Sequence, residues 1–141
     1  MSIPLKLSVL LLCVPMTAGA FDGMNAAAVY ECRADAVNQD RIDTCIARFP
    51  SLASRAQEAM ANWRSRNAAK AKLAQDACEA ENKTLSAPPT AAELAQTRQL
   101  WDELLAEIRT AFQDRVQREG PGACIATLEQ LGRAGGTMDF R

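Results

Sequence analysis

The chain has 141 residues, of which 48% are hydrophobic and 23% charged, and it carries a formal net charge of −1 with no histidine. This composition is that of one soluble domain, and the balanced charge excludes the clustered excess of Lys and Arg that non-specific nucleic-acid binding requires. The lack of histidine excludes Ser-His-Asp and Cys-His catalysis and histidine-ligated zinc or haem. We therefore expect no nucleic-acid partner, no metal site and no cofactor.

Residues 1–20 have the pattern of a secretory signal peptide. Lys6 precedes an apolar run over residues 7–14, and Ala18-Gly19-Ala20 forms an A-x-A cleavage site. The run is shorter than the roughly 20 apolar residues that span a bilayer. We therefore expect cleavage before Phe21, a periplasmic or secreted product and no stable membrane anchor.

Two helices are predicted in the first half of the remaining chain. Apolar residues recur at three- and four-residue steps over residues 29–49. Because Asp40 could cap a second start, this stretch is either one helix or two. Residues 52–82 predict a second long helix, and its inner face is almost all alanine after Trp63, which favours close packing between helices.

The second half predicts one long helix, one short helix and a tail. Thr90-Ala91-Ala92-Glu93 is a capping box, and the clearest amphipathic stripe of the chain follows it. Gly120-Pro121-Gly122 ends that helix, and a short helix extends to Leu131. Residues 134–141 begin with a Gly-rich stretch and are expected to form a flexible tail.

These elements predict an all-α fold over residues 21–133. The expected architecture is a disulfide-stapled antiparallel helical bundle with three long helices and a short C-terminal helix. The expected core anchors are the large aromatic side chains Trp63, Trp101, Phe49 and Phe112. An apolar stripe as broad as that of the third helix is also compatible with a homodimer.

Four cysteines follow the signal peptide, and an even number in an exported chain indicates two disulfides. Cys45 and Cys124 both fall within about 10 Å of the Pro50 turn, which favours their pairing. Cys32 then pairs with Cys78 by elimination, although straight helices would separate their heights by roughly 15 Å. The alternative, Cys32–Cys45 with Cys78–Cys124, makes a local staple but leaves its second pair about 40 Å apart unless a helix breaks.

Two groups of charged side chains could carry chemistry or binding. The densest carboxylates, Asp102, Glu103 and Glu107, lie on the polar side of an amphipathic helix, where a solvated face is the simplest interpretation. The second helix carries a cationic stripe that could dock an acidic partner or an anionic membrane surface, or could face the acidic third helix or solvent. This stripe consists of Arg55, Arg64, Arg66, Lys70 and Lys72.

One motif resembles a known group of proteins. Cys32, then Cys45-x3-Phe49-Pro50, then Trp63-x2-Arg66-Asn67 is similar to the pattern of small exported all-helical proteins of proteobacteria. The resemblance implies a periplasmic location and adds no catalytic residue.

We therefore expect a small, non-enzymatic periplasmic module that binds a protein, as an inhibitor, an immunity protein or an assembly factor does. The alternative is a carrier or sensor of a small apolar ligand held within the bundle. A hydrolase that uses carboxylates alone is the third hypothesis.

Overall fold

The computed structural model describes residues 24–82 and 90–140, with side chains placed for residues 27–80 and 90–140. The predicted signal peptide, residues 1–20, lies outside these residues. The described part forms three long helices and a short one: α1 (Met24–Arg48), α2 (Ala53–Asn82), α3 (Ala91–Glu119) and α4 (Pro121–Gly132). The 3-10 turn η1 (Pro50–Leu52) joins α1 to α2. The all-helical class is confirmed.

Local sequence signals explain where α3 and α4 begin and end. Thr90 Oγ1 accepts the Glu93 N–H at 3.2 Å, and the Glu93 carboxylate accepts the Thr90 N–H at 2.7 Å, so the predicted capping box is formed. Gly120 ends α3 with a φ of 67°, a conformation that glycine adopts without a Cβ clash. Pro121 then opens α4, where its missing N–H costs nothing.

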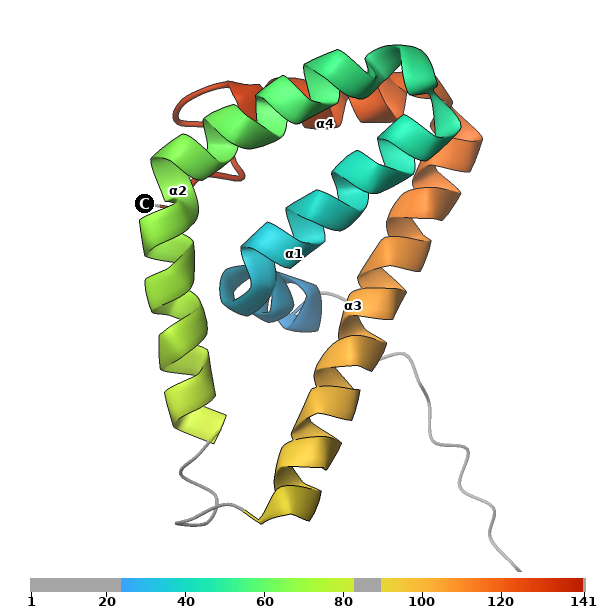
Figure 1. Cartoon of the computed structure of the whole chain (residues 1–141). Helices are drawn as coiled ribbons and strands as arrows, with labels where there is room; N and C mark the ends of the chain where they lie inside the picture. Colours follow the sequence, from blue (N-terminus) through green and yellow to red (C-terminus); the bar gives the residue numbers. More distant parts are fainter. Residues whose placement is uncertain (1–23, 83–89, 141) are drawn as a thin grey trace, which may run out of the picture.

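Helix α1 lies between α2 and α3, and α4 packs across the end where α2 begins and α3 finishes (Figure 1). One group of buried side chains joins α1, α2 and α4 around Trp63 and Met60, both at most 3% exposed. A second group surrounds Cys45 and Cys124 and includes Phe112 of α3. Of the four expected core anchors, Trp63 and Phe112 are buried, whereas Phe49 and Trp101 are half-buried.

The structure contains the disulfides Cys45–Cys124 and Cys32–Cys78, with Cα atoms 5.6 and 5.9 Å apart. The favoured pairing is confirmed, and the alternative is wrong. Two bends close the separation expected of straight helices. Helix α1 breaks at Arg33, whose φ and ψ are −139° and 29°, and α2 bends in its middle (Figure 1).

The break in α1 falls at Arg33 and not at Asp40, the position that could have capped a restart. Asp40 lies within continuous helix, where its carbonyl accepts the Thr44 hydroxyl at 2.8 Å. In α2, Asn67 Nδ2 donates to the carbonyl of Trp63 at 3.0 Å. A side-chain donor that competes for an i−4 carbonyl bends a helix.

Residues 133–140 turn back and pack against α1 and α2. Met138 and Phe140 contact the buried group around Trp63. The expectation of a flexible tail over residues 134–141 rested on local glycine content and did not foresee these contacts. Residue 141 lies outside the described part.

Candidate functional site

The five cations of α2 are all engaged within the chain. Arg64 makes a two-pronged ion pair with Asp35 of α1, with donor–acceptor distances of 2.7 and 2.9 Å. Lys72 binds Asp76 at 2.9 Å on the same helix. Arg55 binds Glu129 of α4 at 3.2 Å, and Lys70 donates to the Phe140 carbonyl at 3.0 Å, while Arg66 binds the C-terminal tail. Among the described residues, the acidic partners of these cations therefore lie on α1, α2, α4 and the tail, and not on the third helix.

Arg66 and Asn67 hold residues 131–140 to α2. The Arg66 guanidinium donates to the carbonyls of Leu131 and Arg133 at 2.7 and 3.2 Å, which satisfies the end of α4. It also binds both carboxylate oxygens of Asp139 at 3.2 Å. Arg66 therefore closes α4 and fixes the tail at once.

The Asn67 side chain pairs with the tail through both of its polar atoms. Its Nδ2 donates to Asp139 at 2.7 Å, and its Oδ1 accepts the Phe140 N–H at 2.9 Å. The Met138 carbonyl accepts two further hydrogen bonds at 2.8 Å, from Trp63 Nε1 and from the Tyr30 hydroxyl. We call these groups, Tyr30, Trp63, Arg66 and Asn67 with residues 138–140, the tail clasp.

Two pKa shifts mark the tail clasp. Burial raises the pKa of Asp139, but the hydrogen bonds from Arg66, Asn67 and the Gly135 N–H outweigh it, so the pKa of this carboxyl lies below its ordinary value. Burial raises the pKa of the Tyr30 phenol above its ordinary value. At neutral pH the clasp therefore holds a charged carboxylate and a protonated phenol.

Arg41 lies beside the tail clasp in an unusual setting. Its guanidinium carbon is 5.7 Å from the centre of the Tyr30 ring and 5.9 Å from that of Phe112. Burial lowers the pKa of Arg41, yet an arginine stays charged at neutral pH. The two aromatic faces therefore supply part of the electrostatic support that a carboxylate gives elsewhere.

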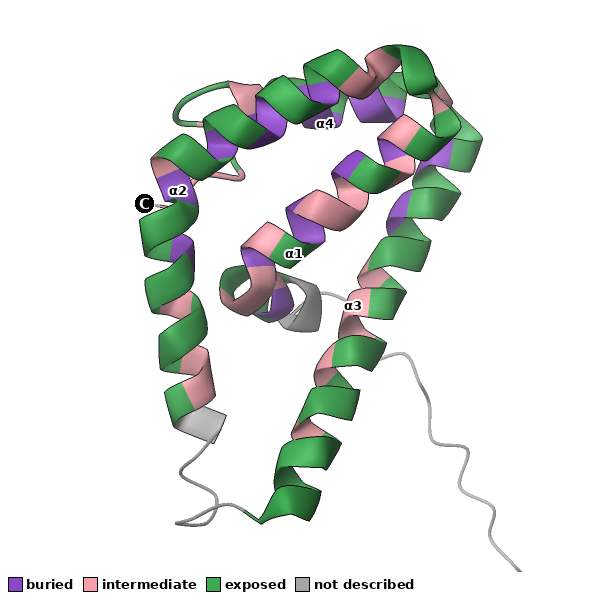
Figure 2. Cartoon of the chain, viewed as in Figure 1, coloured by how far each residue is buried: buried purple, intermediate pink, exposed green. Residues whose placement is uncertain are grey.

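The apolar stripe of α3 is covered along only half of its length (Figure 2). Towards the C-terminal end, Phe112 and Val116 are 8% and 3% exposed. Trp101, Leu104, Leu105 and Ile108 are half-buried, and nearer the start Leu94 and Leu100 are 43% and 54% exposed. We call the five apolar side chains of the less covered half the α3 face: Leu94, Leu100, Trp101, Leu104 and Leu105.

Arg33 anchors this half of α3 to the rest of the molecule. Its guanidinium carbon lies 4.9 Å from the centre of the Trp101 ring, within the range of a cation–π contact. The same side chain binds Glu79 of α2 at 3.2 Å. The break in α1 thus places one cation between α2 and α3, and this cation contacts Trp101 within the α3 face.

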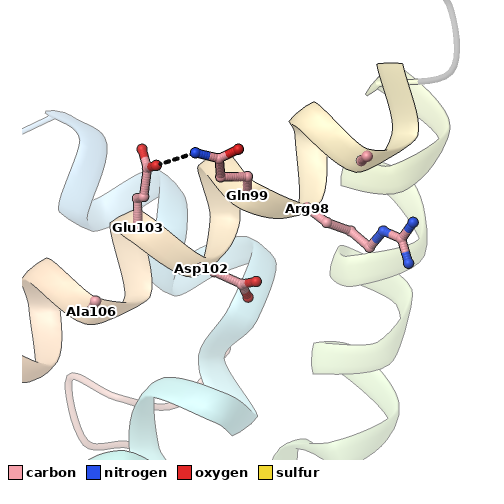
Figure 3. A pocket seen from close by; sticks show the side chains of 6 residues that line it. Arg98, Gln99, Asp102, Glu103 and Ala106 are labelled. Atoms are coloured by element: carbon pink, nitrogen blue, oxygen red, sulfur yellow. Dashed lines mark hydrogen bonds between the residues drawn. The ribbon is translucent and has the colours of Figure 1, made fainter. Parts of the chain in front are cut away.

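The carboxylates Asp102, Glu103 and Glu107 are exposed. Asp102 and Glu103 line an open hollow of about 560 Å³, and Glu103 accepts a hydrogen bond from Gln99 at 2.8 Å (Figure 3). Within the described residues, no group of three or more acidic or cysteine side chains is placed to hold a metal ion. Among the described residues, the side chains that line this hollow come from α3 alone.

Sequence reasoning placed Arg66 and Asn67 in a motif beside Trp63, but it missed the tail that they bind. The usable signal was Asp139 between two large apolar residues, Met138 and Phe140, since a tail that stays in solvent gains nothing from such a triplet. The sequence also predicted the apolar stripe of α3, but it did not indicate which half of that stripe is exposed.

Comparison with protein-family models, with curated proteins and with solved structures finds no match for this chain. Among residues 24–82 and 90–140, no helix is long and apolar enough to cross a membrane. The two disulfides are typical of proteins exported to an oxidising compartment.

Proposed function

We propose that this chain is a small, non-enzymatic module that binds a protein in the periplasm or outside the cell, as an inhibitor, an immunity protein or an assembly factor does. In this proposal its helices form an antiparallel bundle that is stapled by the two disulfides. The observation that carries the proposal is the α3 face, an apolar surface in which Leu94 and Leu100 are 43% and 54% exposed and the other three side chains are half-buried. Clustered exposed apolar side chains rimmed by polar ones mark protein-binding surfaces.

The geometry favours the α3 face over the α2 cations as the docking surface. Arg64 and Arg66 are committed to Asp35 and to the tail clasp, so a partner would have to compete with existing ion pairs. Leu94 and Leu100 have large exposed fractions and lose only water on docking. The alternative of an apolar ligand within the bundle has less support, because Ala56 and Ala59 are 0% and 4% exposed and bring α2 close to its neighbours.

Site-specific crosslinking in the native host tests this proposal. A photo-crosslinking residue replaces Leu100 on the α3 face in one strain and Leu73 in a matched control strain. Leu73 is 70% exposed on α2 and lies outside the α3 face. We expect one predominant protein adduct from position 100 and none from position 73. Equal adduct patterns from the two positions would contradict the proposal.

A further inference from the structure

We infer that the α3 face docks a basic amphipathic helix of the partner protein. The inference rests on the proposed function and names the chemistry of the partner. It combines two properties of the same segment, its uncovered apolar stripe and its charge.

The negative charge of α3 is concentrated in its less covered half. Residues 91–107 hold four carboxylates and one guanidinium, whereas residues 108–119 hold three guanidinium groups and two carboxylates. The covered half therefore has a small positive balance, and the half that carries the α3 face has a balance of three negative charges. Acidity and uncovered apolar surface occur together on one segment.

Carboxylates lie at both edges of the α3 face. At about 100° per residue, its five apolar side chains span an arc of about 140°, from Leu100 at one edge to Leu105 at the other. Glu107 lies about 20° beyond Leu100, and Asp102 lies about 60° beyond Leu105. Figure 3 shows the side chains of Asp102 and Glu103 leaving α3 in different directions. A helix seated on the α3 face would meet a carboxylate at each of its two edges.

A basic helix fits this arrangement better than two other occupants. A second copy of this chain would bring the same carboxylates against one another, which is repulsive at short range. An anionic lipid surface would be repelled by the same groups. A partner helix with Leu at the i, i+3, i+4 and i+7 positions and Lys or Arg on its edges satisfies both the stripe and the flanks.

The length of the face sets the size of the contact. From Leu94 to Leu105 the helix rises about 17 Å, close to three turns. A partner segment of three to four turns would cover this line, and Trp101, already held by Arg33, would form its fixed centre. Aromatic residues at the centre of an interface contribute disproportionately to affinity.

Calorimetry with two synthetic helices tests the inference on the oxidised chain without its signal peptide. One peptide is an amphipathic Leu/Lys helix of about four turns, and the other is its Leu/Glu counterpart with the same apolar pattern. We expect the Leu/Lys peptide to bind at least about tenfold more tightly at low salt, with the difference shrinking in high salt because screening weakens exposed charge pairs.

Three variants assign the binding to the α3 face. Replacing Leu94 and Leu100 with Gln should weaken Leu/Lys binding at least about tenfold, and the D102N/E107Q pair should weaken it less and flatten its salt dependence. The control Leu73→Gln should bind as the parent chain does. All of these positions are exposed, so circular dichroism should show unchanged helicity.

Several outcomes would overturn the inference. The inference is wrong if the two peptides bind with equal affinity, or if Leu73→Gln loses as much affinity as the variant with Leu94 and Leu100 replaced. It is also wrong if the chain forms a homodimer that dissociates when Leu94 and Leu100 are replaced. The crosslinking experiment distinguishes failure of this inference from failure of the proposed function. An adduct at position 100 with a partner that offers no basic helix refutes the inference alone, whereas absence of an adduct specific to position 100 contradicts the proposed function itself.

Discussion

Replacing Asp139 with Asn should release the C-terminal tail from α2. The Asp139 carboxylate accepts hydrogen bonds from Arg66, from Asn67 and from the Gly135 N–H, and it is held against a guanidinium that is itself 24% exposed. Asparagine has nearly the same shape, but it lacks the charge and turns one acceptor into a donor. The substitution therefore removes the ion pair with Arg66 and places the new side-chain N–H group against one of the N–H donors that the carboxylate had accepted.

The expected cost is about 2 to 3 kcal/mol in the free energy of unfolding. Hydrogen bonds to a charged group contribute roughly 1.5 to 3 kcal/mol each, and the partly buried position places this pair above the 0 to 1 kcal/mol of an exposed one. Arg66 keeps its bonds to the carbonyls of Leu131 and Arg133, which limits the loss. For a chain of this size, the change corresponds to a fall in Tm of roughly 8 to 12 °C.

Urea unfolding monitored by tryptophan fluorescence measures this cost, because Trp63 lies in the tail clasp. The matched control is Asp114→Asn, which removes a carboxylate from an exposed position on α3. The reasoning is refuted if Asp139→Asn is within about 0.5 kcal/mol of that control, the scatter expected of ordinary surface substitutions. Amide exchange at Phe140 provides a second readout, since its N–H is bound only while the tail is seated.

The pH dependence of the same comparison has a definite sign. Because the pKa of Asp139 is lower in the folded chain, its contribution to stability is complete above the unfolded value of about 4. That contribution is lost as pH falls through the lowered folded value. The stability gap between the parent chain and Asp139→Asn should therefore be full at neutral pH and should close in acid. A gap that persists unchanged at low pH would show that the carboxylate charge is not its origin.

Three further predictions follow from the core and the clasp. Tyr30 is the chain's single tyrosine, and burial raises the pKa of its phenol. Absorbance titration should therefore give a midpoint above 10 in the folded chain and about 10 after unfolding, and the free energy of unfolding should fall as pH rises through the raised pKa. Replacing both Cys45 and Cys124 with Ala should lower the free energy of unfolding, measured with a chemical denaturant, by about 4 kcal/mol, because the disulfide joins residues 79 positions apart. A loss under about 1 kcal/mol would show that restriction of the unfolded chain is not the main effect of this disulfide. Ala56→Leu should destabilise the chain by about 1 to 3 kcal/mol in thermal unfolding, because its position is 0% exposed, and a neutral result would reveal free space between the helices.

Much of the fold was predictable because its signals are local. The capping box at Thr90 and the Gly120-Pro121 turn depend on backbone groups a few residues away, so the bounds of α3 follow from sequence. Helix rise, a local quantity summed along the chain, favoured Cys45–Cys124, and Cys32–Cys78 followed by elimination. The chemistry that the chain lacks was equally readable, because the absence of histidine does not depend on folding.

The remaining features depend on contacts between distant segments. Local composition did not reveal that the tail bonds to Arg66 and Asn67, which lie more than 70 residues away from Asp139. Periodicity placed an apolar stripe along all of α3, whereas the arrangement of α1 and α4 determined that Phe112 is buried and Leu100 is not. The sequence by itself determined the helices and the staples that hold them. Only tertiary structure decided which charges are paired and which apolar surface is left exposed, because both depend on which segments meet.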